Sequence, residues 1–548
     1  MIAKVAPMPT RRYLGCMNAL ALLALPIVLA GCSPQESPNG ASTGRGPGAA
    51  ASHATHAHAD TPGIQWFDGS VEQAFEAARS SRKPILLYWG AVWCPPCQQL
   101  KATVFSRPEF IAKSRLFVPV YLDGDGEGAQ KWGEQFRVSG YPTVVVLDAD
   151  RHELMRIAGG MDLSLYATVL DNALADLQPV AELLAQVGAG KPLDESRCRR
   201  LALNSWLLDE LPPEDQIAAR SRQLATAAAS CPSSLATERA RLVVVSAALL
   251  AKSEGKALKQ GAAPSAALQA SVAAVGQVLA DERRSVAVAD VLFSLGDDFF
   301  LAVKSSRDSA KWLASYVRTM DAVAVEPAYA EADQLAAIWA KLHALKAGGA
   351  ATPGGAVRAA TARIDAALAG QQTPYVRTSI VNSVLNIYDV LGQNERAYAV
   401  AKEEMQHSAT PYYYMGDLGD ICESLGRKEE ALEWYARGYE GAQGTATRFQ
   451  WGEQYAAALV ELRPGDAETI GKVTAQVLGE LDGPDRIYRR ARIRLERLDK
   501  ALRGWNEASK GAHAPVLASL RGRMQQVCAR IPPAEPARGS CDAFLAGS

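Results

Sequence analysis

The chain has 548 residues, which is too long for one ordinary domain and predicts two to four. Its formal net charge is −1, so the overall charge of the chain does not favour binding to nucleic acid or to an anionic surface. Aromatic residues are sparse and alanine is abundant, a composition that suits packed helices.

Residues 1–32 have the pattern of a processing segment rather than of a folded element. Positively charged residues precede an apolar stretch, 14–29, which ends in Leu29-Ala30-Gly31-Cys32. This ending resembles the lipobox of bacterial lipoproteins, which implies that Cys32 is lipidated and becomes the first residue of the mature protein. An uncleaved anchor or an ordinary signal site is the alternative. Because Ser33 follows the cysteine, the usual sorting rule for such lipoproteins favours the outer membrane, with the protein facing the periplasm.

Residues 33–62 are rich in Ser, Gly, Pro, Ala and His, which predicts a disordered tether. A flexible chain of this length spans roughly 30 Å and would keep the next domain close to the membrane. We interpret His53, His56 and His58 as solvated linker residues rather than as a metal site.

Residues 63–178 read as an α/β domain. Ser70 and Gln73 form a capping-box pattern that opens a helix to about Ser81, and the apolar run 84–89 predicts a buried strand. The remaining predicted elements are helices at 95–105, from 106, at 128–137 and at 162–176, and strands at 116–122, 143–147 and 152–157.

The motif Trp93-Cys94-Pro95-Pro96-Cys97 lies between the predicted strand 84–89 and the start of the predicted helix 95–105. A helix N-terminus favours an anion, and for a cysteine that anion is the reactive thiolate. We therefore predict Cys94 as the exposed nucleophile and Cys97 as the thiol that resolves a mixed disulfide. Half of a zinc site and a static disulfide are the alternatives, but the chain contains no second Cys-x-x-Cys.

A second motif, Gly140-Tyr141-Pro142-Thr143, precedes a β-branched run. Together the two motifs resemble the thioredoxin family, and segment 103–110 resembles the C-terminal periplasmic domain of the DsbD thiol:disulfide interchange protein. The resemblance implies that the Tyr141–Pro142 peptide is cis and faces the active disulfide. It also implies that Trp93, Tyr141 and Pro142 bind the substrate.

The motif departs from that family in two ways. Tyr88 stands where many thioredoxins carry a buried Asp that serves proton transfer, so proton handling by Cys97 has no assigned group. Pro95 and Pro96 have no N–H and cannot donate to the Cys94 sulfur. Fewer donors mean a less stabilised thiolate, which favours a reductase or isomerase over a strong oxidant.

An acidic pattern follows the second predicted strand, 116–122. Asp123, Asp125, Glu127, Gly128 and Glu134 fall at the spacing of a calcium loop. The segment follows a strand instead of a helix, however, and lacks the usual apolar residue. We therefore interpret it as a polar turn that caps the next helix, and we expect no metal site.

Beyond residue 180 the sequence predicts only helices, in two parts, 180–370 and 371–548. Leu391-Gly392-Gln393-Asn394-Glu395-Arg396-Ala397 recurs as Leu425-Gly426-Arg427-Lys428-Glu429-Glu430-Ala431, 34 residues later. This period and pattern resemble the tetratricopeptide repeat family, which implies helical hairpins with a face for a protein partner.

The cysteines of the predicted helical region can be assigned to candidate disulfides by their positions. Cys198 with Cys231, and Cys528 with Cys541, are candidate disulfides that would suit an oxidising compartment. Cys422 is left over, and we interpret it as a small buried residue.

The sequence thus predicts a thioredoxin-like α/β domain followed by an all-α helical-repeat domain. The predicted function is that of a membrane-tethered periplasmic thiol–disulfide oxidoreductase that uses protein thiols or disulfides as substrates and an upstream thiol as electron donor. No cofactor beyond the Cys94–Cys97 pair is expected. The alternative is an envelope scaffold that acts through its helical repeats. A donor for cytochrome c maturation is a weaker option, because the sequence has no haem-specific feature.

Overall fold

The computed structural model describes residues 63–126, 128–138, 140–157, 165–207, 214–370, 372–483 and 486–547. The predicted signal segment, Cys32 and the tether at 33–62 lie outside these residues. Among the helices of the described ranges, none combines the length and apolar character that crossing a membrane requires.

The α/β domain is built on one sheet of four strands in the order β2-β1-β3-β4. β1 is parallel to β2 and antiparallel to β3, and β3 is antiparallel to β4. All six residues of β1 are buried because its side chains alternate between two apolar clusters, with Leu86 and Tyr88 on one face and Leu87 and Trp89 on the other. The strands are β1 Ile85–Gly90, β2 Val118–Asp123, β3 Thr143–Leu147 and β4 Glu153–Ile157.

Five helices complete this domain, and all lie close to their predicted positions: α1 Val71–Ser81, α2 Pro95–Leu100, α3 Pro108–Ser114, α4 Ala129–Gln135 and α5 Leu165–Ala175. The capping box is present, since the Ser70 hydroxyl accepts from the Gln73 N–H and the Gln73 side chain accepts from the Ser70 N–H. The helix expected over 95–105 is α-helical only as far as Leu100. It continues as one π-helical turn, Lys101–Phe105.

The rest of the described chain is entirely helical, so the predicted fold class is confirmed. Its first part contains α6 Val180–Gly188, α7 Glu195–Leu203, α8 Glu214–Ser230, α9 Ala236–Lys259, α10 Ala266–Leu279, α11 Glu282–Ala287, α12 Ala289–Leu292, α13 Asp297–Lys304, α14 Ser309–Val323, α15 Glu331–Ala347 and α16 Gly354–Ala369. Its second part contains α17 Pro374–Leu391, α18 Asn394–His407, α19 Pro411–Ser424, α20 Lys428–Gly441, α21 Thr445–Leu462, α22 Ala467–Gly479, α23 Arg489–Ala508, α24 Ala514–Cys528 and α25 Pro536–Ala543.

The sequence repeat occupies equivalent turns of this array. Gly392 ends α17 and Gly426 follows α19, with φ of +68° and +74°. Each glycine lets the chain reverse within two or three residues, and the next helix then packs back on the previous one. Neighbouring helices from α17 to α22 contact each other in sequence, as expected for stacked helical hairpins.

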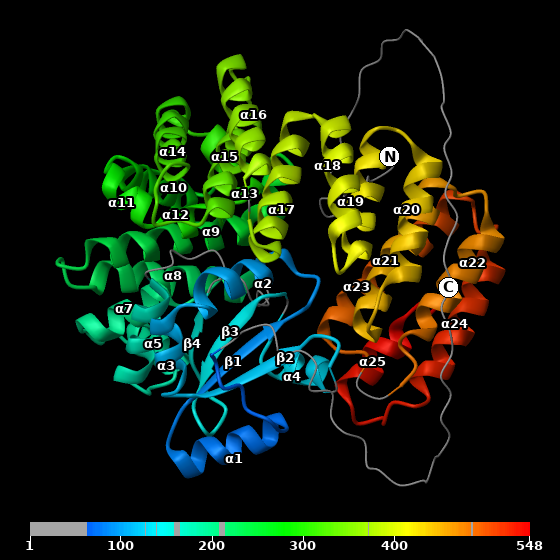
Figure 1. Ribbon diagram of the computed structural model, residues 1–548, viewed down its shortest axis with the longest axis horizontal. Coiled ribbons are helices and arrows are strands. Elements are labelled where there is room, and N and C mark those ends of the chain that lie inside the picture. The colour runs from blue at the N-terminus through cyan, green and yellow to red at the C-terminus, as the bar shows by residue number, and fades with distance from the viewer. Residues whose placement is uncertain are drawn as a thin grey trace, which may run out of the picture.

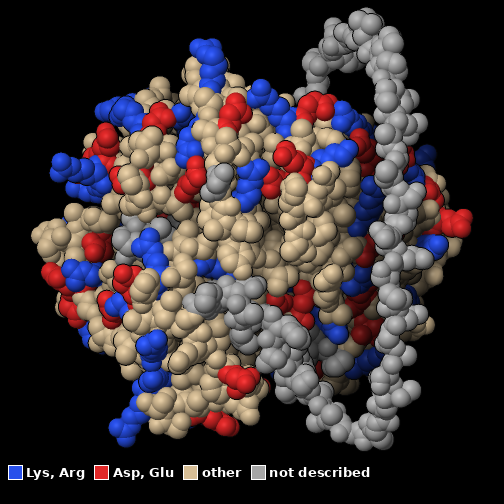
Figure 2. Space-filling view, viewed as in Figure 1, with Lys and Arg blue, Asp and Glu red and all other residues tan. Residues whose placement is uncertain are grey.

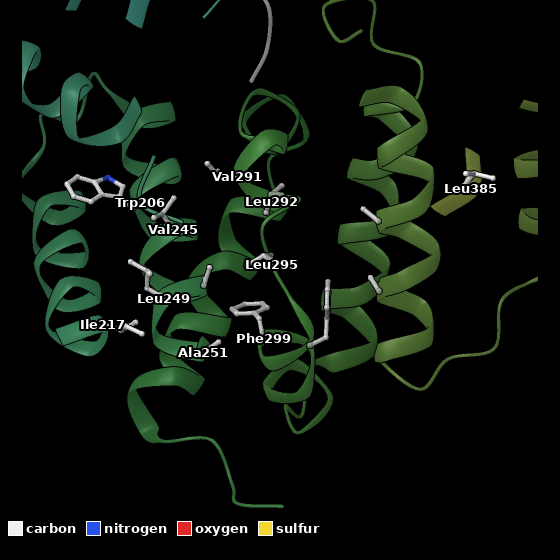
Figure 3. Close-up of a cluster of buried hydrophobic side chains, with 14 of the residues drawn as sticks. Trp206, Ile217, Val245, Leu249, Ala251, Val291, Leu292, Leu295, Phe299 and Leu385 are labelled. Atoms are coloured by element: carbon white, nitrogen blue, oxygen red, sulfur yellow. The ribbon is translucent and has the colours of Figure 1, made fainter. Parts of the chain in front are cut away.

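The helical region has its own continuous core. Figure 3 shows part of it, where side chains such as Ile217 from α8, Leu249 from α9 and Phe299 from α13 meet in one buried cluster. Both candidate disulfides are formed, Cys198–Cys231 and Cys528–Cys541, and Cys422 is fully buried, as predicted.

The helical region is joined to the edge of the sheet. The backbone N–H of Ser205 donates to the carbonyl of Arg156 in β4 at 2.9 Å, and the Asn204 side chain accepts from the Arg156 N–H at 2.8 Å. The buried Arg200 guanidinium donates to the Leu154 carbonyl at 2.8 Å. From this edge the helices curve around the sheet, over α2 and down to α25 on the other side (Figure 1). Positive and negative side chains are interspersed on the face seen in Figure 2.

Candidate functional site

The cysteine pair lies at the end of β1, where the chain turns into α2. Cys94 is the N-cap residue of α2, and Pro95 occupies its first turn, where a missing N–H costs nothing. The Cys97 N–H donates to the Cys94 sulfur at 3.2 Å, so the motif supplies one backbone donor beyond the two prolines. The two cysteines are joined as a disulfide, with Cα atoms 5.2 Å apart.

The structure corrects one prediction about this pair. Cys94 was expected to be exposed, but it is only 2% exposed, and Cys97 is completely buried. The reason is that the helical region covers the site, as Figure 1 shows for α17 above α2. The Ser379 hydroxyl of α17 reaches the Pro95 carbonyl at 3.3 Å, and Gln99 of α2 donates to Asp333 of α15 at 2.8 Å.

Trp93 is the second point of contact with the helical region. Its indole N–H donates to the Thr447 hydroxyl of α21 at 2.9 Å. Its ring lies edge-on to Trp451, with ring centroids 4.9 Å apart, and stacks on Tyr413 at 6.1 Å. The residue predicted to meet substrate therefore meets Thr447, Trp451 and Tyr413 of the helical region.

Asp125 strengthens the same contact from the loop after β2. Its carboxylate accepts from the Thr447 N–H at 2.8 Å and from the Thr447 hydroxyl at 2.5 Å. Burial raises the pKa of Asp125, although the two hydrogen bonds from Thr447 act in the opposite direction. Thr447 thus links Trp93 and Asp125 across the boundary between the α/β domain and the helical region.

The loop predicted to hold a cis-proline does so: the Tyr141–Pro142 peptide is cis. Tyr141 and Trp93 pack against the small buried cluster that contains Cys94 and Cys97, as the family resemblance implied. The Arg490 guanidinium of α23 lies 3.9 Å from the centre of the Tyr141 ring, within cation–π distance. The helical region therefore covers this loop as well.

Tyr88, the departure from the family pattern, lies in the core with 1% exposure. Within the described ranges its hydroxyl has no hydrogen-bond partner, and burial raises its pKa. A phenol that keeps its proton does not replace the carboxylate of the family. Lys101, in the π-helical turn, is also buried, and its ammonium lies 5.8 Å from the Tyr121 ring centre.

The acidic residues that fall at calcium-loop spacing make contacts within the protein instead. Asp123 accepts from the Asp125 N–H at 2.9 Å, which makes the expected polar turn. Glu134 accepts from the Arg489 N–H and from the Arg492 guanidinium, both at 2.7 Å, and so joins α4 to α23. Glu127 is outside the described residues. In the parts of the chain that are described, no three His, Cys, Asp or Glu side chains gather at metal-binding geometry.

Sequence reasoning missed the residues that cover the site. Ser379, Thr447 and Arg490 belong to no motif and lie far along the chain from the cysteines. One usable signal was the run of arginines from 489 to 497, which marks α23 as strongly basic. Its contact with the cysteine-bearing domain has no signature in the sequence.

Comparison with known families agrees with the geometry of the site. Residues 71–174 match the family model of a thioredoxin-like domain. This match runs from the start of α1 almost to the end of α5, which is about a fifth of the chain, and it includes both cysteines and the cis-proline. A comparison of the chain with curated proteins found no match.

Proposed function

We propose that the protein is a thiol–disulfide oxidoreductase in which Cys94 and Cys97 form the redox couple. The observation that carries this proposal is the Cys94–Cys97 disulfide at the start of α2 in a thioredoxin-like domain, with Tyr141 of the cis Tyr141–Pro142 peptide packed against it. In the reduced protein, the Cys94 thiolate attacks a partner disulfide and one partner sulfur leaves as a thiolate. The Cys97 thiolate then attacks the Cys94 sulfur, which releases the reduced partner and forms the Cys94–Cys97 disulfide.

The direction of electron flow is the finer part of the proposal. We place the protein with the reductases and isomerases, because Pro95 and Pro96 have no N–H and leave the Cys97 N–H as the donor that the motif supplies to the Cys94 sulfur. A weakly stabilised thiolate makes a more reducing couple. Each turnover as a reductant consumes two electrons, which an upstream thiol donor must return to the Cys94–Cys97 disulfide.

Access to the site requires a movement of the helical region. A disulfide with 2% and 0% exposed cysteines offers no surface on which a partner sulfur can align for attack. We therefore propose a closed resting arrangement that opens by separating α17 and α21 from α2 and Trp93. The same opening would free the faces of α17 and α21 to bind the protein partner that the helical repeats were predicted to recruit.

The cellular setting remains part of the proposal. A lipid at Cys32 and the tether at 33–62 would hold the protein at the membrane, facing the periplasm. The two further disulfides, Cys198–Cys231 and Cys528–Cys541, support an oxidising compartment.

Reduction of insulin by dithiothreitol tests the proposed activity. We expect the wild-type protein to accelerate insulin precipitation, and the variants Cys94→Ser and Cys97→Ser to lose this acceleration. Cys422→Ser is the matched control, because Cys422 lies on α19 and has no disulfide partner. Equal rates for the wild type and Cys94→Ser would overturn the proposal.

A further inference from the structure

A cavity of about 530 Å³ lies between the α/β domain and the helical region. Its lining includes Trp93 and Tyr141 from the α/β domain and Arg486, Arg490 and Arg494 from the helical region. The volume falls within the range of sites for small organic molecules. Neither cysteine lines this cavity, so it is separate from the point of thiol–disulfide exchange.

The arginines of the cavity carry more positive charge than their neighbours balance. Arg490 donates to the neutral Gln450 side chain at 2.8 Å and lies over the Tyr141 ring. Arg494 must share the one carboxylate of Glu453 with Arg497, at 3.2 and 3.0 Å. Burial lowers the pKa of Arg494 to about 10, and the charges of Arg490 and Arg497 act in the same direction.

Arg486 adds a further charge. It precedes α23, is partly buried, and makes no ion pair or hydrogen bond with any residue that the structure describes. Guanidinium groups that leave water without a carboxylate partner are costly to bury, and a bound anion would relieve that cost.

The two carboxylates that line the cavity already have donors. Both oxygens of Asp125 accept hydrogen bonds from Thr447. Glu480 accepts from the Arg448 guanidinium at 2.9 Å and from the Tyr439 hydroxyl at 2.9 Å. Neither carboxylate forms an ion pair with Arg486 or Arg490, so these two guanidinium groups are left to bind another oxyanion.

We propose that this cavity is a binding site for a small organic anion, held through its oxyanion groups by Arg486 and Arg490. The planar guanidinium fork bonds carboxylate and phosphate oxygens in pairs, so both groups fit the same site. Trp93 and Tyr141, which also line the cavity, provide apolar surface for the remainder of the molecule. A ligand placed here would contact both domains and would stabilise the closed arrangement over the disulfide.

Titration calorimetry on the full chain tests this site with citrate as the carboxylate probe and glucose 6-phosphate as the phosphate probe. Glucose, at matched ionic strength, is the neutral control. We expect saturable binding of at least one anionic probe and none of glucose. We expect Arg490→Gln to weaken that binding by about tenfold or more, because one charge-assisted pair is lost. The probe that binds more tightly identifies the preferred oxyanion.

Two further variants make the test specific. Arg486→Gln repeats the experiment at a residue outside any helix, which covers the case in which Arg490→Gln fails to fold. Arg283→Gln changes an exposed arginine of α11 and should bind like the wild type. The double variant Cys94→Ser, Cys97→Ser should also bind normally, which separates this site from the proposed redox activity. Absence of binding up to about 10 mM probe, or equal weakening in all three arginine variants, would overturn the proposal.

Discussion

The indole N–H of Trp93 donates a 2.9 Å hydrogen bond to the hydroxyl of Thr447, which lies 354 residues further along the chain. Trp93 directly precedes the candidate redox pair Cys94 and Cys97, and Thr447 belongs to the first turn of α21. The same Thr447 holds the carboxylate of Asp125 through two hydrogen bonds. One threonine therefore ties the helical region to both sides of the candidate active site.

The first prediction concerns this threonine. Thr447→Val keeps the side-chain shape but removes the hydroxyl bonds to Trp93 and to the Asp125 carboxylate, the latter worth about 1.5–3 kcal/mol. We expect the closed arrangement to open more often, so that dithiothreitol reduces Cys94–Cys97 roughly tenfold faster. The measurement is the rate at which the two thiols appear, followed by quenching and mass mapping.

Thr226→Val is the control for that experiment. Thr226 is exposed on α8, where its hydroxyl donates only to the Arg222 carbonyl at 3.0 Å. In Thr226→Val, dithiothreitol should reduce the Cys94–Cys97 disulfide at the wild-type rate. If Thr447→Val is also reduced at the wild-type rate, the cover over the disulfide does not limit access.

The second prediction compares two glycines that both have a positive φ. Gly444 has φ +82°, and a Cβ added there would lie 2.2 Å from the Asp125 Cγ. Gly392 has φ +68° and open space around it. Alanine should cost about 1–2 kcal/mol of backbone strain at Gly392. The strain should be larger at Gly444, because its ψ of 146° lies in a region restricted almost entirely to glycine, and only Gly444→Ala should also displace Asp125. We therefore expect faster reduction of Cys94–Cys97 in Gly444→Ala and an unchanged rate in Gly392→Ala.

The third prediction concerns Cys422 and pH. Burial raises the pKa of its thiol from an ordinary value of 9.0 to about 12. At about pH 8 the native protein should leave Cys422 unmodified by iodoacetamide, since the thiolate is the reactive form. Peptide mapping should find Cys422 labelled only after unfolding in urea. Labelling of the native protein at the rate of a free cysteine would show that the residue is not buried in solution.

The raised pKa of Cys422 also predicts how the free energy of unfolding changes with pH. Below pH 9.0 the thiol is protonated in both the folded and the unfolded protein, and the contribution of Cys422 to the free energy of unfolding is fully present. As the pH rises from 9.0 towards about 12, only the unfolded protein loses this proton, so the folded protein loses stability. Cys422→Ala should show a shallower alkaline decline in urea denaturation.

The fourth prediction concerns a buried ion pair in the helical region. Arg241 of α9 makes two hydrogen bonds of 2.7 Å to Asp290 of α12, and both side chains are almost completely buried. Arg241→Met leaves the Asp290 carboxylate without its partner and should lower the free energy of unfolding by about 3–5 kcal/mol. The double variant Arg241→Met, Asp290→Leu should recover most of that loss. Failure of the double variant to recover would assign the loss to packing rather than to charge.

The sequence predicted the elements that depend on short-range pattern. The apolar run 84–89 became β1, the capping box at Ser70 opened α1, and Pro142 was placed correctly in its loop, because each is determined by neighbouring residues. The repeat at Gly392 and Gly426 located two equivalent helical turns for the same reason.

The burial of the candidate active site could not be predicted in this way. Cys94 has the local sequence of an exposed nucleophile, and its cover consists of contacts from residues hundreds of positions away, such as Ser379 and Thr447. Packing between two domains depends on the shape of both surfaces, which no local pattern records. The cavity lined by Arg490 exists only because of that packing.

The most direct test of the account is to trap a mixed disulfide. Without the resolving thiol, Cys97→Ser should hold any partner on Cys94 through a disulfide bond when the full chain is expressed in its native cells and quenched with acid. The account predicts discrete adducts on non-reducing gels, which reductant removes and which become more abundant when Thr447→Val is added. Absence of adducts in both variants, with Cys94 still able to react with a small disulfide, would contradict a thiol–disulfide oxidoreductase and favour a scaffold that acts through its helical repeats.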